Sequence, residues 1–145
     1  FDLTYIDENG EKKRPVVIHR AILGTFDRFM AYLIEETKGA FPLWLAPVQI
    51  NVIPVNLEYH ESYAHEIFDW LTENDYRVDI DLRNEKLSYK MRDSVVRKIP
   101  VTVILGQKEM DDRVISYRKF GSNETISVSK EEFMAYLQNC LQNKN

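Results

Sequence analysis

The chain of 145 residues is 44% hydrophobic and 29% charged, a composition that supports one compact domain and a short additional segment. Its formal net charge of −4 argues against a protein whose overall field attracts polyanions, so nucleic-acid binding would depend on a local basic surface. The single cysteine, Cys140, excludes an internal disulfide, and no apolar run approaches the roughly 20 residues that a bilayer span requires. We expect a cytoplasmic protein.

The first 38 residues are expected to form a hairpin followed by a helix. Residues 1–7 alternate as a half-buried strand, Asn9-Gly10 supplies turn chemistry, and residues 14–19 resume strand character. Thr25 is a candidate helix N-cap, and the apolar residues after it recur at helical spacing until Gly39. Glycine and proline close together at this point predict a domain boundary.

Residues 39–145 are expected to form an α/β domain, a mixed five-stranded sheet with three helices. The predicted strands lie at residues 48–55, 77–82, 101–105, 113–118 and 125–128. The predicted helices lie around residues 63–71, at about 85–98, and after Ser129, which forms a capping-box pattern with Glu132. The order strand, helix, strand predicts parallel pairing through a right-handed crossover, and the last two strands predict an antiparallel hairpin.

Residues 83–98 form the densest positive segment. Six Lys or Arg residues stand there against two acidic residues, a local excess of four positive charges. On a helix, one side would carry Lys86, Lys90 and Lys98, and the opposite side an apolar stripe of Leu87, Met91 and Val95. This pattern indicates either a presented basic surface or simply a solvated amphipathic helix.

Polar residues follow two of the predicted strands and suit single-stranded RNA. Arg83 and Asn84 follow one strand, Glu109 follows another, and Arg118 closes the next, so we expect them near one edge of the sheet. Asparagine can read base edges, arginine can stack or pair with phosphate, and glutamate can accept from base amino groups. Tyr89 and Tyr117 are candidate aromatic faces, and the alternative is that these are turn charges and half-buried tyrosines.

Independent catalysis is not expected from these residues. His19 lies in a predicted buried strand, where a histidine is more often packed than metal-bound, and Arg28 on a helix is usually a surface cation. His60 and His65 do not have the spacing of a helical zinc pair. The sequence also lacks a glycine-rich phosphate loop and a nucleophile elbow.

Four segments, in order along the chain, resemble the C-terminal part of bacterial-type threonyl-tRNA synthetases. These segments are residues 18–28, 41–49, 81–86 and 104–109. The first resembles the third class II motif of the catalytic domain, and the others resemble the class IIa anticodon-binding domain. The resemblance implies that residues 1–38 end a class II catalytic domain and that residues 39–145 form an anticodon-binding domain.

The resemblance also implies a role for individual residues. His19 matches a histidine that helps to hold a catalytic zinc ion, and Arg28 matches an arginine that binds the ATP phosphates. Three residues match positions that read the anticodon: Asn84, Glu109 and Arg118. Three more are expected to support these contacts: Arg83, Lys86 and Arg92.

For the whole enzyme, the resemblance implies ATP-dependent attachment of threonine to tRNA(Thr), with zinc and Mg-ATP as cofactors and a homodimer as the assembly. Neither DNA nor a membrane is an expected partner. The other zinc ligands, the other class II motifs and the editing region are absent from these 145 residues, so we expect anticodon recognition without catalysis and without bound zinc. The alternative is an accessory protein that uses the same α/β module for dimerisation or protein docking.

Overall fold

The computed structural model describes residues 2–144, and two compact units divide this part of the chain between Tyr32 and Leu33. This division falls inside helix α1 (Phe26–Thr37). The domain boundary after residue 38 stays a prediction. None of the helices among the described residues combines the length and apolar character that crossing a bilayer requires.

The first unit contains the predicted hairpin in a shorter form. Strands β1 (Tyr5–Ile6) and β2 (Lys12–Lys13) pair antiparallel, and Phe1 lies outside the described residues. The Asp7 carboxylate accepts from the amides of Asn9 and Glu11 at 2.9 Å each, which closes the turn. Gly10 has a φ of +78°, a conformation that favours glycine.

The strand expected at residues 14–19 is wrong, and so is the expected burial of His19. The second strand of the hairpin is β2, and residues 14–19 form no strand pairing. Val17 and Ile18 are exposed, and His19 is exposed beside them. The alternating pattern predicts a strand only where a neighbouring strand supplies hydrogen bonds, and none among the described residues pairs with this segment.

The helix predicted after Thr25 is confirmed as α1. The Thr25 hydroxyl accepts from the Arg28 amide at 3.4 Å, in the manner of an N-cap. The helix ends before Gly39, whose φ is +74° and whose amide donates to the Ile34 carbonyl at 2.9 Å. A left-handed glycine after the last turn is a common way to end a helix.

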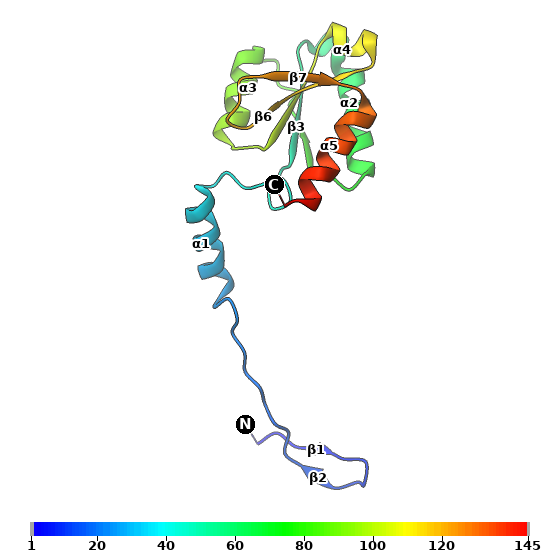
Figure 1. The fold of residues 1–145 in the computed structure, drawn as a ribbon. Coiled ribbons are helices and arrows are strands. Elements are labelled where there is room, and N and C mark those ends of the chain that lie inside the picture. The colour runs from blue at the N-terminus through cyan, green and yellow to red at the C-terminus, as the bar shows by residue number, and fades with distance from the viewer. Residues whose placement is uncertain (1, 145) are drawn as a thin grey trace. The chain divides into compact units, whose positions relative to one another are not determined.

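The second unit contains a mixed five-stranded sheet, as predicted (Figure 1). Its elements in chain order are β3 (Ile50–Pro54), α2 (Leu57–Glu73), β4 (Val78–Ile80), α3 (Leu87–Val96), β5 (Val101–Leu105), α4 (Gln107–Asp112), β6 (Ile115–Lys119), β7 (Thr125–Val128) and α5 (Lys130–Gln142). The strand order is β4-β3-β5-β6-β7. Strand β3 pairs parallel with β4 and β5, whereas β6 pairs antiparallel with β5 and β7.

The number of helices differs from the prediction, because residues 39–144 contain four helices rather than three. The additional one is α4, in a segment interpreted as a polar turn. This helix is six residues long with Met110 as its only apolar residue, so helical periodicity is not visible in the sequence. It begins where the Glu109 carboxylate accepts from the amide of Gly106 at 2.9 Å.

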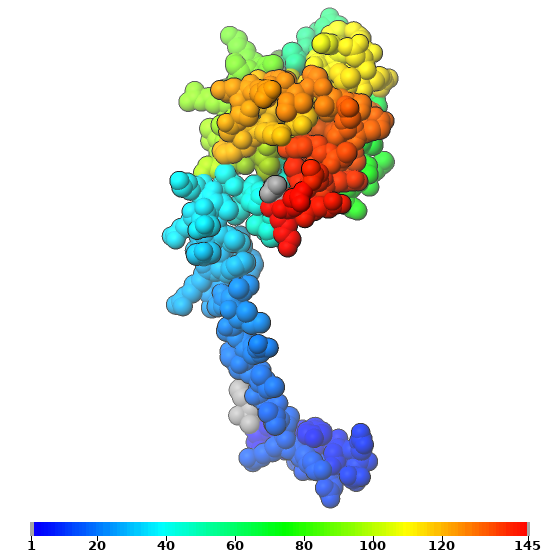
Figure 2. Space-filling view, viewed as in Figure 1, coloured from blue at the N-terminus to red at the C-terminus, as the bar shows by residue number. Residues whose placement is uncertain are grey.

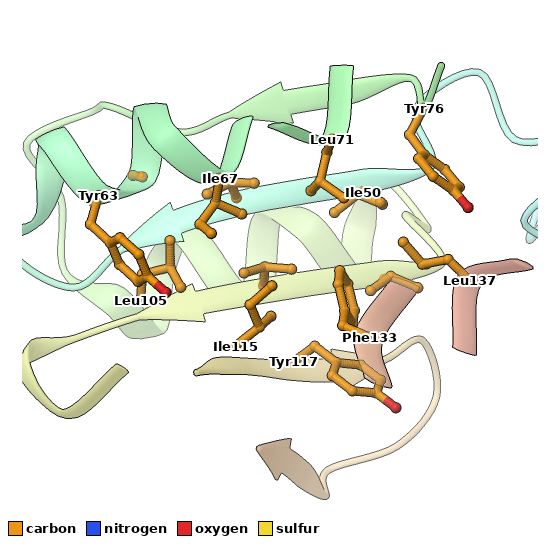
Figure 3. Close-up of a cluster of buried hydrophobic side chains, with 14 of the residues drawn as sticks. Ile50, Tyr63, Ile67, Leu71, Tyr76, Leu105, Ile115, Tyr117, Phe133 and Leu137 are labelled. Carbon is orange, nitrogen blue, oxygen red and sulfur yellow. The ribbon is translucent and has the colours of Figure 1, made fainter. Parts of the chain in front are cut away.

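The apolar core lies on one face of the sheet, under α2 and α5. Figure 3 shows inward-pointing side chains from three sources, with Ile67 and Leu71 from α2, Phe133 and Leu137 from α5, and Ile50 and Ile115 from the sheet. All six are fully buried. Helix α3 lies on the opposite side of the sheet from α2 and α5 (Figure 1). The two faces of the sheet are therefore covered by different helices.

Side-chain caps fix where α2 and α5 begin. The Asn56 side chain accepts from the Glu58 amide at 2.9 Å, and the ring Nδ1 of buried His60 accepts from the Asn56 amide at 3.2 Å. At α5 the predicted capping box is present, since Ser129 and Glu132 each accept from the backbone amide of the other. The role of His60 is thus a local structural one.

Candidate nucleic-acid interface

A row of polar side chains crosses the sheet on the side that α3 covers. The strand register places Asn51 of β3 beside Thr102 of β5. The row continues to Arg118 of β6 and then to Thr125 of β7. Residues that are neighbours in register point to the same side of a sheet. The hydroxyl of Ser94 in α3 lies 2.7 Å from that of Thr102, which fixes the row on the α3 side.

A second polar pair lies two residues along the same strands. Ser116 of β6 is the register partner of Ser127 of β7, and their hydroxyl oxygens are 2.6 Å apart. Side chains two residues apart on a strand share a face, so both lie on the α3 side. We call the surface made by these six residues the polar face: Asn51, Thr102, Ser116, Arg118, Thr125 and Ser127.

Glu109 is joined to the polar face through Ser116. One carboxylate oxygen accepts from the Ser116 hydroxyl at 2.6 Å, and the other accepts from the Gly106 amide at 2.9 Å. Burial by itself would raise the pKa of the Glu109 carboxyl, but the hydrogen bonds from Ser116 and from the backbone amides outweigh it, so the pKa lies below its usual value. Glu109 is therefore ionised at neutral pH and acts only as an acceptor.

Arg118 has hydrogen-bonding capacity that the protein does not use. Its Nη2 donates to the Thr125 hydroxyl at 3.0 Å. Among the described residues, its Nε and the Oδ1 of Asn51 are buried and have no hydrogen-bond partner. Such atoms are rare in folded proteins, and an ordered water or a bound polar group is an ordinary way to satisfy them. The two atoms belong to one row of the polar face.

The prediction that Arg118 lies at the same edge of the sheet as Glu109 is wrong. Arg118 is paired with Thr102, near the beginning of β5, whereas Glu109 follows the end of β5. Strand β6 runs antiparallel to β5, so its last residues return to the opposite end of the sheet. The two side chains are linked along β6 instead, because Ser116 contacts Glu109 and Arg118 follows on the same face.

The loop after β4 is held by Arg83. Its guanidinium contacts both carboxylate oxygens of Asp81, at 2.9 and 2.6 Å, and reaches the Asp93 carboxylate at 2.8 Å. These hydrogen bonds raise the pKa of Arg83 above its ordinary value. Its guanidinium carbon also lies 5.6 Å from the centre of the exposed Tyr89 ring. The charge of Arg83 is thus already paired within the protein.

Asn84 lies in this loop with an exposed side chain. It follows the edge strand β4, and strands β3 and β5 separate β4 from the strand that carries Arg118. At about 4.8 Å between neighbouring strands, Asn84 and Arg118 belong to sites roughly 14 Å apart across the sheet. The structure therefore joins Glu109 to the strand of Arg118 but does not bring Asn84 into contact with either.

The expected orientation of α3 is wrong in one important respect. Lys90, placed on the presented basic side, is only 2% exposed, whereas Val95, placed on the apolar stripe, is 51% exposed. The Lys90 ammonium donates to the Asp81 backbone carbonyl at 3.0 Å, which replaces hydration at this site. Burial lowers the pKa of Lys90, and the Asp81 carboxylate opposes this shift.

The basic surface of α3 is consequently smaller than its sequence indicates. Arg97 pairs with Asp79 at 2.7 Å, and the Lys98 ammonium donates to the Lys38 carbonyl. Lys86 at the N-terminus of α3 and Arg92 within it are exposed, and no ion pair engages either within residues 2–144. These two cations remain for contacts with phosphate.

Tyr117 does not offer an aromatic face to a ligand. It is 4% exposed and belongs to the apolar core on the other side of the sheet. Its ring is stacked on Tyr136 with 5.0 Å between centroids, and Phe133 lies equally close. It is the residue immediately before Arg118, and alternation along a strand sends neighbouring side chains to opposite faces.

His19 and Arg28 belong to the first unit, whereas the polar face belongs to the second. Both side chains are exposed, the first in an extended segment and the second near the start of α1. The part of the chain that the structure describes contains no group of three or more His, Cys, Asp or Glu residues placed to hold a metal ion. His19 alone does not meet the ligand requirement of zinc, so no chemistry is assigned to a metal in this chain.

The hydroxyl residues of the polar face were missed by sequence reasoning. Ser116, Thr125 and Ser127 carry no recognisable motif. A weak signal exists, because polar residues alternate with Ile115, Tyr117, Ile126 and Val128 along β6 and β7. That alternation indicates a polar side of the sheet but not which partners share it.

Comparisons with known proteins match this region of the molecule. A family model described as an anticodon binding domain matches residues 49–140. The threonine–tRNA ligase of Staphylococcus epidermidis is 50% identical over 134 residues, which are 92% of this chain and 21% of that protein. That of Geobacillus kaustophilus is 48% identical over 144 residues, which are 99% of this chain and 22% of that protein. The chain thus spans about a fifth of the length of these relatives.

A solved structure is similar as well. It is the crystal structure of the RNA binding domain of threonyl-tRNA synthetase from Cryptosporidium parvum Iowa II, with a TM-score of 0.79 and 26% sequence identity. The match covers 95% of this chain and 35% of that chain. The similarity therefore includes the mixed sheet and the helices on both of its faces.

Proposed function

Because the chain belongs to the anticodon-binding domain family, whose model matches residues 49–140, we propose that it binds the anticodon of a tRNA through the polar face of its sheet. The observation that carries this proposal is Arg118, a cation whose buried Nε has no partner among the described residues, on the same strand as the Ser116 that Glu109 holds. An arginine and a carboxylate linked along one strand through Ser116 suit the mixed donors and acceptors of unpaired bases. Asn84, with the exposed Lys86 and Arg92 near it in the chain, extends the proposed contacts, and Arg83 supports them by holding this loop through Asp81 and Asp93.

The tRNA of this proposal is tRNA(Thr), and the longer protein is a threonine–tRNA ligase that attaches threonine to it with ATP. Identities of 48% and 50% to two such ligases support this, over nearly the whole of the chain. Aminoacylation, zinc, Mg-ATP, a homodimeric assembly and a cytoplasmic location are proposed for the longer protein. His19 and Arg28 would contribute there one zinc ligand and one phosphate contact.

Electrostatics should contribute modestly to RNA binding. Lys86 and Arg92 are exposed cations that no ion pair engages among the described residues, so they are the ones we expect to contact phosphate. Two phosphate contacts with a single strand give a slope of about −1.4 in a plot of log affinity against log salt. Most of the preference for a given anticodon should therefore come from base contacts.

The test compares binding of the chain to an anticodon stem-loop and to one with a scrambled anticodon. Arg118→Ala or Asn84→Ala should weaken binding to the first about tenfold, which corresponds to about 1.4 kcal/mol, and binding to the second far less. Arg92→Ala serves as the control, because loss of a phosphate contact should weaken both complexes equally and make the salt slope shallower by about 0.7. Equal losses for all three variants would leave nonspecific charge attraction only, as the protein-docking alternative expects.

A further inference from the structure

Two hydroxyl groups of β7 lie where a bound RNA would meet the edge of the sheet. Thr125 and Ser127 are exposed, and two residues apart on a strand they share the polar face. Within residues 2–144, strand β7 is an edge strand that pairs only with β6. In the space-filling view it lies at the surface of the second unit (Figure 2). Neither residue belongs to the set matched to anticodon contacts.

The hydrogen-bond chain from Glu109 fixes the direction of the Ser127 hydroxyl. The ionised Glu109 carboxylate only accepts, so the Ser116 hydroxyl donates its single proton to it across 2.6 Å. Ser116 therefore has no proton left for Ser127, whose oxygen is also 2.6 Å away. The proton in that contact must come from Ser127. The exposed oxygen of Ser127 then offers only lone pairs to a ligand.

The Thr125 hydroxyl accepts in its contact with the protein, whereas the Ser127 hydroxyl donates. Its oxygen accepts from Arg118 Nη2 at 3.0 Å, and a guanidinium has no acceptor to offer in return. The proton of the Thr125 hydroxyl is therefore free. The two hydroxyl groups therefore differ in hydrogen bonding. Ser127 lies next to Ser116, whose own proton goes to the Glu109 carboxylate, and Thr125 lies next to the Arg118 guanidinium.

We propose that β7 takes part in reading the anticodon, with Ser127 accepting from an amino or imino donor of an unpaired base and Thr125 donating to an acceptor of the same RNA segment. This inference rests on the proposed function and deepens it. Glu109 fixes the accepting role of Ser127 through Ser116. Two hydrogen bonds, from Ser116 to Glu109 and from Ser127 to Ser116, connect the carboxylate to the hydroxyl that contacts the RNA. An RNA that places an acceptor opposite Ser127 meets lone pairs and is rejected.

The experiment measures affinity for the anticodon stem-loop and for loops in which one anticodon base at a time carries an acceptor in place of a donor, such as inosine for adenosine or uridine for cytidine. The unaltered chain should bind one of these altered loops about 2- to 10-fold more weakly than it binds the natural loop, the range expected for one neutral hydrogen bond. Ser127→Ala should bind that altered loop and the natural loop with equal affinity. Ser127→Thr retains the hydroxyl and should retain the discrimination.

The sharpest variant is Ser116→Ala, which leaves the Ser127 hydroxyl in place but removes its obligatory acceptor. Ser127 can then donate or accept, so the discrimination between the loops should fall toward one, whatever change in affinity for the natural loop the loss of the Ser116–Glu109 hydrogen bond brings. Ser62→Ala, a loss of an exposed hydroxyl on α2, is the matched control and should change nothing. Thermal unfolding of each variant checks that the fold is retained. If Ser116→Ala does not fold, the comparison of Ser127→Ala with Ser127→Thr tests the inference.

Two outcomes would overturn the inference alone. One is a Ser127→Ala variant that discriminates between the loops as Ser62→Ala does. The other is a folded Ser116→Ala variant that retains full discrimination. Both apply when the unaltered chain still prefers the anticodon loop to a scrambled one. If the unaltered chain shows no such preference, the proposed function fails and this inference fails with it.

Discussion

The two faces of the central sheet are built from neighbouring residues of the same strands but have different chemistry. Toward α2 and α5, the strands present fully buried apolar side chains such as Val52, Val103 and Ile115. Toward α3, they present Thr102 and Ser116, each of which is buried beside another hydroxyl. The aliphatic side chains of the first face have no polar atom to offer a ligand. The second retains hydrogen-bonding groups at some cost in stability.

This comparison separates folding from binding in a way that mutations can test. Apolar burial without polar atoms stabilises a fold in proportion to the area removed from water. Polar groups held in fixed directions add little net stability, but they specify which groups a partner must present. Substitutions on the apolar face should therefore change the free energy of unfolding, and those on the polar face should change recognition as well.

The largest effect is expected from Phe133→Ala on the apolar face. Phe133 is fully buried against Tyr117, with ring centroids 5.0 Å apart. Its truncation should lower the free energy of unfolding by about 3–5 kcal/mol in urea titrations. Affinity of the folded fraction for the anticodon stem-loop should stay unchanged.

Phe120→Ala is the control for this comparison, because Phe120 is 38% exposed and should contribute about 1 kcal/mol or less. A loss of RNA affinity in Phe133→Ala that exceeds its unfolded fraction would show that the two faces are not independent.

A smaller effect, with a distinct pH dependence, is expected from Asp81→Asn at the loop after β4. Hydrogen bonds from Arg83 lower the pKa of Asp81 below its unfolded value, so its stabilising contribution is present above pH about 4 and is lost as the pH falls through the lower folded-state pKa. The variant should be about 2 kcal/mol less stable at pH 7. The difference should narrow as unfolding is measured at successively lower pH below 4.

Asp79→Asn is the matched control, because the Asp79–Arg97 pair is exposed and should contribute about 0–1 kcal/mol. A difference between Asp81→Asn and the unaltered chain that stays constant from pH 7 to pH 2 would contradict the assigned ion pair.

The smallest of these effects concerns the hydroxyl pair between α3 and β5. Ser94 and Thr102 are 1% and 5% exposed, so Thr102→Val leaves a buried hydroxyl without its partner. This should lower the free energy of unfolding by about 1–2 kcal/mol. Adding Ser94→Ala should recover most of the loss, because no unpaired group then remains. Additive losses in this double-mutant cycle would show that the two hydroxyls act independently.

The sequence predicted the five strands of the sheet and two of their pairings well, because its strands are short apolar runs separated by strong turn signals. Residues 101–105 were predicted as a strand and form β5 with the same bounds. It failed for residues 14–19, where apolar alternation was present but a neighbouring strand was not. It also failed for α4, because six residues are too few to show a helical period.

The candidate site was predictable only in part. The roles of Asn84, Glu109 and Arg118 came from a resemblance and stay proposals, whereas their placement is a result of the structure. Lys90 shows most clearly what periodicity cannot predict. Lysine is almost never fully buried, so helical periodicity alone assigns Lys90 to the solvent-exposed side of α3. Its burial depends on the Asp81 carbonyl, which the chain brings to it from the preceding loop.

The sequence by itself determined the elements of this protein and its family likeness, because apolar periodicity, caps and turns act between residues close along the chain. Only the tertiary structure decided that Glu109 would share Ser116 with Ser127, and that Arg118 would stand beside Thr102 and Thr125. Those contacts depend on strand register and direction, and register is fixed when distant segments bury their apolar sides together. The direction in which a hydroxyl donates is likewise set by neighbours that the chain order does not reveal.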